Sequence, residues 1–216
     1  MQNNAAVFKT SEFSEVKDYF NIVLVGDSSV GKTSILEKYV YDTFQSQLKN
    51  KKIIEIYKKK VCFHENLYRL KFWDITKFIG KKDISVDMFY NCDGIIFVSS
   101  YDQKSSLENL NRWYQSLIEY VDLSTKEMIW LINKKDLGKE KVLTEEEIEK
   151  KSKDLQLDYY EVSSKTGENV DDGINKIVKK LIKRCCDSNF AIEDFSTSDS
   201  DNEDLKIENN DKCNVF

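Results

Sequence analysis

The sequence predicts an α/β protein of three layers, in which about five helices flank a six-stranded, mostly parallel sheet. Short, continuous apolar runs alternate along the chain with longer segments of helical periodicity. Strands that are buried on both faces show such runs, and in parallel sheets they alternate with helices. One pair of runs is separated only by a short turn, which indicates a single antiparallel hairpin within the sheet.

Six segments are expected to be strands. The first, Phe20–Val25, is an apolar and β-branched run that ends at Gly26. The second and third, residues 53–63 and 67–73, flank the turn-like His64-Glu65-Asn66 and predict the hairpin. The remaining strands are expected at residues 94–100, 128–132 and 159–163.

Helical periodicity occurs in five further segments, at residues 31–41, 83–90, 105–120, 144–155 and 169–185. Thr144 with Glu147 three residues later predicts a capping box at the start of the fourth. Trp113 and Tyr114 lie on the third and are interpreted as packing residues.

Composition and charge restrict the class of protein. The 216 residues suffice for one sizeable core, and 40% hydrophobic with 33% charged residues is usual for a soluble globular protein. No apolar run approaches the roughly 18–20 residues of a membrane span. The mixed, charged N-terminus predicts no secretory signal, and Gln2 argues against N-myristoylation, so a cytoplasmic location is expected.

The charge is unevenly distributed along the chain. Residues 187–216 hold nine acidic and two basic residues of a chain whose net charge is −5. The preceding residues therefore carry about +2, which gives no case for nucleic-acid binding. We expect an N-terminal extension at residues 1–19, one folded domain at 20–186 and a flexible acidic tail at 187–216. The five cysteines form no CxxC pair and are interpreted as free thiols.

A phosphate-binding loop is predicted directly after the first strand. The segment Gly26-Asp27-Ser28-Ser29-Val30-Gly31-Lys32-Thr33 fits the pattern G-x-x-x-x-G-K-[ST] and stands between a strand and a helix. Its backbone N–H groups and the helix N-terminus favour phosphate. Lys32 is expected to reach the β- and γ-phosphates, Thr33 to bind Mg²⁺, and Ser34 to complete the binding segment. A glycine-containing turn with an incidental lysine is the alternative.

A second motif indicates the base. Asn133-Lys134-Lys135-Asp136 follows a predicted strand about 100 residues after Lys32. The Asp136 carboxylate accepts hydrogen bonds, and guanine offers it N1–H and a 2-amino group where adenine does not. The Asn133 amide is expected to tie the loop together, and the Lys134 stem to lie on the base. A third segment, Ser163-Ser164-Lys165, follows the last strand and is expected near the guanine O6.

Together these motifs resemble the Ras-like small GTPases, and within them the Rab family. The resemblance covers about residues 20–186 and rests on GDSSVGKTS, WDI, NKKD and SSK at matching separations. It implies a P-loop nucleotide-binding domain, GTP or GDP with Mg²⁺ as ligands, effector and regulator proteins as partners, and a role in vesicle traffic. By the same resemblance Asp74 is expected to hold a Mg²⁺-bound water.

The chain departs from the family where the nucleotide would be hydrolysed. In the register after Trp73, Lys77 stands at the position of a glycine that contacts the γ-phosphate, and Phe78 stands at that of the catalytic glutamine. A phenyl ring has no hydrogen-bonding group, so Phe78 cannot orient the attacking water. No residue is therefore assigned a catalytic role.

The first switch region departs as well. Lys51 stands where the family has a threonine that ligates Mg²⁺, and a charged lysine is not a metal ligand. Lys49, Lys51 and Lys52 either contact phosphate as point charges or form a solvated run, and the second interpretation is favoured. At the three positions of the family's aromatic effector surface the chain has Ile56, Trp73 and Met88, so that two aromatic residues are missing.

The last four residues, Cys213-Asn214-Val215-Phe216, approximate a C-a-a-X prenylation signal and predict geranylgeranylation of Cys213, although Asn214 is a poor match. Cys185 and Cys186 are open to palmitoylation but are interpreted as core or surface thiols. The leading hypothesis is a Rab-like protein that binds guanine nucleotide, hydrolyses GTP slowly or not at all, and reaches an endomembrane through its lipid. The alternatives are a conventional switch completed by an activating partner, and a scaffold that does not hydrolyse nucleotide.

Overall fold

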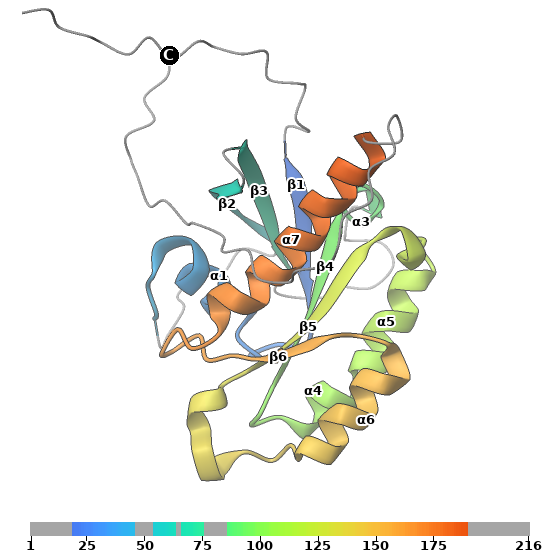
Figure 1. Cartoon of the computed structure of the whole chain (residues 1–216). Helices are drawn as coiled ribbons and strands as arrows, with labels where there is room; N and C mark the ends of the chain where they lie inside the picture. Colours follow the sequence, from blue (N-terminus) through green and yellow to red (C-terminus); the bar gives the residue numbers. More distant parts are fainter. Residues whose placement is uncertain (1–18, 46–53, 64–65, 76–85, 190–216) are drawn as a thin grey trace, which may run out of the picture.

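The computed structural model describes residues 19–45, 54–63, 66–75 and 86–189. Six strands in this part of the chain form one sheet: β1 (Phe20–Val25), β2 (Ile54–Phe63), β3 (Asn66–Ile75), β4 (Gly94–Ser100), β5 (Glu127–Asn133) and β6 (Tyr159–Glu161). Their order across the sheet is β2-β3-β1-β4-β5-β6. Only the β2–β3 pair is antiparallel, and the other neighbours run parallel (Figure 1). The predicted fold class is confirmed.

Helices cover both faces of this sheet. On one face α1 (Lys32–Tyr41) and α7 (Val170–Asn189) pack against the strands. The other face is covered by α3 (Val86–Tyr90), α4 (Lys104–Glu108), α5 (Leu110–Ile118) and α6 (Glu145–Leu155). Short 3-10 helices, Leu123–Thr125 and Lys135–Glu140, follow α5 and β5.

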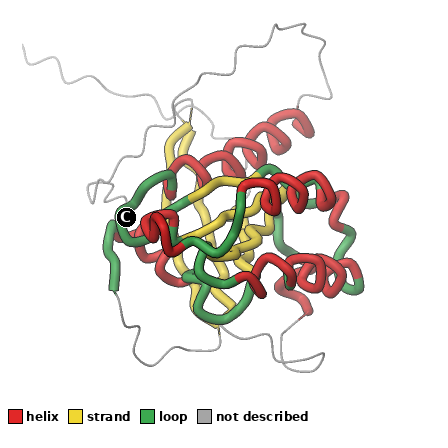
Figure 2. Tube along the Cα trace, turned by 90° about the horizontal axis from the view of Figure 1, so that it is seen from below, coloured by secondary structure: helices red, strands yellow, loops and turns green. Residues whose placement is uncertain are grey.

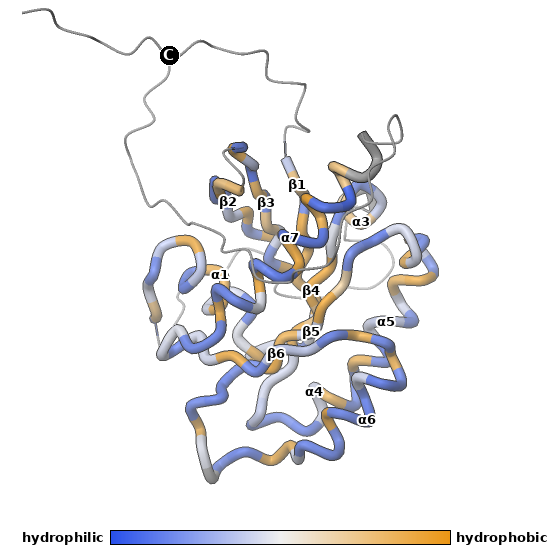
Figure 3. The backbone as a smooth tube through the Cα atoms, viewed as in Figure 1, coloured by the Kyte–Doolittle hydropathy of each residue, from blue (hydrophilic) through white to orange (hydrophobic). Residues whose placement is uncertain are grey.

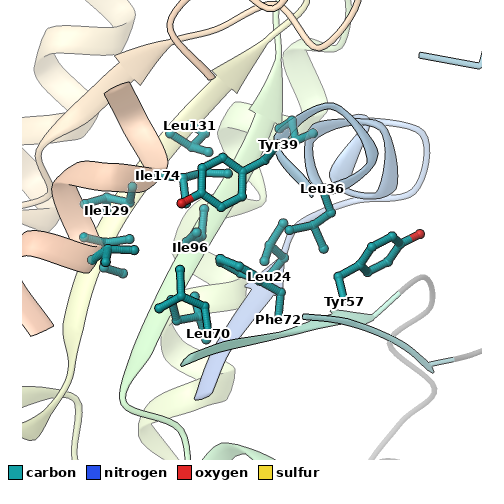
Figure 4. Packing of buried hydrophobic residues seen from close by; sticks show 14 of the residues in the cluster. Leu24, Leu36, Tyr39, Tyr57, Leu70, Phe72, Ile96, Ile129, Leu131 and Ile174 are labelled. Atoms are coloured by element: carbon teal, nitrogen blue, oxygen red, sulfur yellow. The ribbon is translucent and has the colours of Figure 1, made fainter. Parts of the chain in front are cut away.

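Alternation along the strands divides the core into two halves. Ile22 and Leu24 of β1 point to the face covered by α1 and α7, whereas Val23 and Val25 point to the opposite face. Figure 4 shows the first half, where Leu36 and Tyr39 of α1 approach side chains of the sheet and Ile174 of α7. Apolar residues are concentrated in the central strands, and the helices carry polar residues as well (Figure 3). Burying so much apolar surface is the main stabilising contribution to the fold.

Most predicted elements agree with the structure to within two residues at each end. The capping box is confirmed, because Thr144 Oγ1 accepts from the Glu147 backbone and Glu147 Oε2 accepts from the Thr144 backbone. The prediction of one helix at 105–120 is wrong in one respect. The segment forms α4 and α5, separated at Asn109, whose φ of −73° and ψ of −9° stay in the right-handed region but depart from the regular helical ψ of about −42°. Periodicity does not reveal such a break, because the apolar stripe continues across it.

Among the residues that the structure describes, no helix combines the length and the apolar character that crossing a membrane requires.

Candidate functional site

The predicted site residues meet at the carboxyl edge of the sheet. The loops after β1, β5 and β6 leave from this edge, and Asp74 lies near the end of β3. The strand order reverses at β1, because the chain runs from β1 to β2 and β3 on one side of it and then crosses to β4 on the other side. Ligands of open α/β sheets bind at such a switch point. Figure 2 views the molecule from below, toward these loops.

Two glycines allow the loop after β1 to wrap tightly. Gly26 has φ of 148° and Gly31 has φ of 95°, a region that L-residues with a side chain rarely adopt. A Cβ atom at Gly26 would lie 2.1 Å from the Val98 carbonyl oxygen, and one at Gly31 would lie 2.2 Å from Asn133 Nδ2. Both positions therefore require glycine. They bring the loop against β4 and the end of β5.

Lys32 and Thr33 open α1 directly behind this loop, and both are buried. The Lys32 ammonium donates to the carbonyl oxygens of Gly26 and Asp27, each at 2.8 Å. The Thr33 hydroxyl donates to Asp74 Oδ2, and Asp74 is fully buried. The Lys32 ammonium thus lies inside the loop. The Thr33 hydroxyl and the Asp74 carboxylate, which are in direct contact with each other, offer oxygen ligands of the kind that Mg²⁺ prefers.

Asn133 joins the three predicted motifs. Its Nδ2 atom donates to the Val30 carbonyl at 2.9 Å and to Ser164 Oγ at 3.2 Å, while its Oδ1 atom accepts from the Ser164 backbone N–H at 3.0 Å. Asn133, Val30 and Ser164 are all buried. One side chain therefore fixes the loop after β1 relative to the loop after β6.

A cavity of about 450 Å³ opens between these loops. Its lining includes Ser29, Gly31 and Ser34 from the first loop, Asn133, Lys134 and Asp136 from the second, and Ser164 and Lys165 from the third. Asp136 Oδ1 accepts from Ser163 Oγ at 2.6 Å, and Lys165 Nζ lies 3.8 Å from Asp136 Oδ2. The cavity is within the size range of small-molecule sites.

Lys134 is held in place in the lining of this cavity. Its backbone is left-handed, with φ of 65°, and its ammonium pairs with Asp102 Oδ2 at 2.7 Å. Partial burial raises the pKa of Asp102, but hydrogen bonds from Lys134 and Ser100 outweigh this and leave that pKa below its usual value. The ion pair directs the Lys134 ammonium to Asp102, and Lys134 contributes to the lining of the cavity.

Several residues of the candidate site were not recognised in the sequence. Phe44 and Leu137 also line the cavity, and the Phe44 ring is 40% exposed. Asp27 is not among the residues that line the cavity, and its carboxylate accepts from Asn109 Nδ2 and Trp113 Nε1, each at 2.8 Å. Trp113 therefore anchors the loop as well as packing, a role that only the tertiary structure reveals.

The remaining predicted residues fall into two groups. Lys49, Lys51, Lys52, Lys77, Phe78 and Cys213 lie outside the described residues. At the three effector positions, Ile56 and Trp73 are directly opposite each other on β2 and β3, with Ile56 43% exposed. Met88, a residue of α3, is buried in the core cluster against which Trp73 packs, and it adds no exposed surface there.

Comparisons with known proteins agree with this geometry. Residues 21–183 match the Ras family. Ras-related protein RABG3c of Arabidopsis thaliana is 30% identical over 172 residues, which cover 75% of this chain and 82% of the relative. Ras-related protein Rab7 of Cenchrus ciliaris is 29% identical over 180 residues, which cover 79% and 85%. Ras-related protein Rab-9A of Rattus norvegicus is 27% identical over 166 residues, which cover 76% and 83%.

Proposed function

The chain belongs to the Ras-like small GTPases and, within them, to the Rab family, and on this premise we propose that it binds guanine nucleotide together with Mg²⁺ and hydrolyses GTP slowly or not at all. The observation that carries the proposal is the contact of Asn133 with both Val30 and Ser164. This contact joins a loop suited to phosphate and a loop suited to a base around one cavity.

Preference for guanine follows from the acceptors on the second loop. Guanine presents two adjacent donors, N1–H and the 2-amino group, and the Asp136 carboxylate accepts both. Adenine presents no such pair. Lys134, held by Asp102, supplies an aliphatic stem to one side of the base, and Phe44 supplies an aromatic ring in the same lining.

The donor set also fits Mg²⁺. The Thr33 hydroxyl and the Asp74 carboxylate are hard oxygen ligands at the start of α1, beside the Lys32 ammonium. Mg²⁺ binds through one or two such protein groups and completes its octahedron with phosphate oxygens and water. When bound, the ion neutralises phosphate charge. Thr33 and Asp74 would then ligate it directly or through water.

Slow hydrolysis follows from the residues at two positions. Phe78 has no group that orients water, and Lys51 has no oxygen for the metal. The binding motifs are complete, whereas the groups that act on the γ-phosphate are replaced. Bound GTP therefore stays intact for long periods, and exchange rather than hydrolysis sets the state of the protein.

By its membership of the Rab family we place the protein in membrane traffic, with effectors and regulators as partners. Cys213 is the proposed geranylgeranylation site, and the lipid brings the protein to the cytosolic face of an endomembrane. A single prenyl chain anchors weakly and reversibly, and the acidic residues that precede it oppose an anionic surface. Replacing Cys213 with serine should abolish membrane recovery.

Thermal unfolding of the purified chain tests nucleotide binding. A ligand at 100 times its Kd stabilises the folded state by about 2.7 kcal/mol. We expect GDP or GTP with Mg²⁺ to raise the melting temperature and the adenine nucleotides to leave it unchanged. Equal responses to guanine and adenine nucleotides would refute guanine recognition. No response to any nucleotide would favour the alternative that the protein is a scaffold that does not hydrolyse nucleotide.

A further inference from the structure

One face of the β2–β3 hairpin carries a cluster of cations. The antiparallel register places Lys58 opposite Lys71 and Lys60 opposite Arg69. Because alternate residues of a strand share a face, all four side chains leave the sheet on the same side as Ile56 and Trp73. We call Lys58, Lys60, Arg69 and Lys71 the basic face.

The basic face is accessible. Lys58, Lys60 and Arg69 are exposed, and Lys71 is half-buried. Within the part of the chain that the structure describes, no carboxylate forms an ion pair with Lys58, Lys60 or Lys71. Aromatic rings flank two of them instead, because the Lys58 ammonium lies 5.6 Å from the Tyr19 ring centroid and that of Lys71 lies 4.3 Å from Trp73.

Two cross-strand pairs of like charge are unfavourable in an isolated sheet. Lysines on an exposed edge strand prevent pairing with other chains, and β2 is such an edge. That role does not extend to β3, which lies between β2 and β1 and has no open edge. Lys71 of β3 therefore remains to be explained, and an anionic partner that covers both strands would contact it together with Lys58 and Lys60 of β2.

The chain itself contains such a partner. Four of the six residues at positions 199–204 are acidic, namely Asp199, Asp201, Glu203 and Asp204. We call this stretch the acidic segment. Asp199, Asp201 and Glu203 alternate with polar residues, so an extended backbone presents their carboxylates at intervals of about 6.6–6.8 Å. Lys58 and Lys60, two residues apart on a strand, have the same spacing.

The acidic segment starts from a point close to the hairpin. The end of α7 lies beside β3, since Cys185 of α7 packs against the core cluster that contains Tyr68 of β3. Tyr68 precedes Arg69 of the basic face, and because successive side chains of a strand point to opposite faces, α7 and the basic face lie on opposite sides of the hairpin. Nine residues, 190–198, separate α7 from the acidic segment and span up to about 30 Å when extended. This length suffices to pass around two strands spaced about 4.8 Å apart.

We propose that the acidic segment at residues 199–204 docks on the basic face of the β2–β3 hairpin within the same molecule. The docked segment neutralises the charges of Lys58, Lys60 and Lys71. It also lies next to Ile56 and Trp73, so a protein that binds this pair must displace it or bind beside it. The docking is electrostatic and exposed to solvent, and it therefore weakens as salt is added.

Zero-length cross-linking of the full-length chain with a carbodiimide, read out by mass spectrometry, tests this placement. The reagent joins carboxylates only to lysines in direct contact. We expect links from the acidic segment to Lys58, Lys60 or Lys71 in monomeric protein, and 1 M salt should reduce all of them at least tenfold. In Lys58→Glu/Lys60→Glu, which removes two of the reactive amines, the remaining links to Lys71 should fall at least tenfold. A compensating variant, Asp199→Lys/Asp201→Lys/Glu203→Lys, combined with the first, should restore links between the two regions.

The matched control is Lys150→Glu/Lys176→Glu, which makes the same change of charge at exposed sites on α6 and α7. This variant should leave the links intact. Links spread evenly over surface lysines, or unaffected by the hairpin variant, would overturn the proposal. Links found only between molecules would overturn the proposal in favour of a second copy of the chain on the basic face. If no links form and the protein instead binds phosphatidylserine vesicles in a way that depends on the hairpin lysines, the proposal would be overturned in favour of a membrane.

Discussion

The indole N–H of Trp113 donates to the Asp27 carboxylate across 2.8 Å, and this bond ties α5 to the loop that follows β1. Asn109, in the turn between α4 and α5, donates to the other carboxylate oxygen at the same distance. The carbonyl of Asp27 in turn accepts from the Lys32 ammonium. A helix on one face of the sheet is thereby connected to the cation in the candidate phosphate site.

Replacing Trp113 with phenylalanine removes the N–H donor and keeps an aromatic ring. We expect the free energy of unfolding to fall by about 1.5–3 kcal/mol, as for the loss of a hydrogen bond to a charged group, and GDP binding to weaken with it. Chemical unfolding and titration with fluorescent GDP measure the two effects. Tyr114→Phe, on the same helix, is the control and should change stability by less than about 0.5 kcal/mol. Identical GDP affinities in the two variants would contradict a role for Trp113 in the loop.

The sheet could be predicted well from the sequence, because a short, continuous apolar run between turn residues is compatible with few structures besides a buried strand. Phe20–Val25 and Gly94–Ser100 are correct at both ends, and in each case the following residue turns away from the sheet at its carboxyl edge. The glycines of the first loop and Asn133 were recognised through their spacing. Trp113 and Asn109 were not, because their partner Asp27 lies more than 80 residues away and only the packed structure brings them together. Phe44 was missed for a similar reason, since nothing around it in the sequence distinguishes it from a core residue.

Asn133→Ala should loosen the whole site. The change removes the Asn133 partner of the Val30 carbonyl and of the Ser164 backbone N–H. Each buried polar group left unpaired lowers the free energy of unfolding by about 1–3 kcal/mol. We expect lower stability and at least tenfold weaker GDP binding. Ser164→Ala is the graded control, because it removes only the longer bond at 3.2 Å and keeps the backbone contact. Equal losses in both variants would mean that the amide is not the central link.

The pair of Thr33 and Asp74 predicts a dependence on Mg²⁺. We expect chelation with EDTA to speed GDP release from the wild-type protein at least tenfold, because an ion held by these oxygens and by phosphate would be lost. Thr33→Ala should release GDP quickly with or without EDTA, whereas Thr33→Ser keeps the hydroxyl and should behave like the wild type. Release that is insensitive to EDTA in the wild-type protein would exclude the metal site.

The ion pair of Asp102 and Lys134 predicts a pH dependence of stability. Because the folded-state pKa of Asp102 is depressed, the pair stabilises the fold above the unfolded value near 3.8 and loses this effect as the pH falls through the folded value. Asp102→Asn should therefore be less stable than the wild type at pH 7, and the difference should shrink as the pH is lowered past the folded value. Urea unfolding over a series of pH values measures it. A difference that persists unchanged at the acid end would show that the asparagine acts through packing rather than charge.

Restoring a glutamine at position 78 separates the two hypotheses about hydrolysis. In single-turnover assays with preloaded GTP and Mg²⁺, the wild-type rate should lie well below the roughly 10⁻⁴ per second that this class reaches unaided. If the metal and phosphate groups are otherwise competent, Phe78→Gln should raise the rate toward that value, because the amide can orient the attacking water. Lys51→Thr supplies the missing metal oxygen, and the double variant should exceed either single one. A wild-type rate already near 10⁻⁴ per second, the value for the class, would instead mean that neither Phe78 nor Lys51 disables the site, and that the protein cycles as a conventional switch.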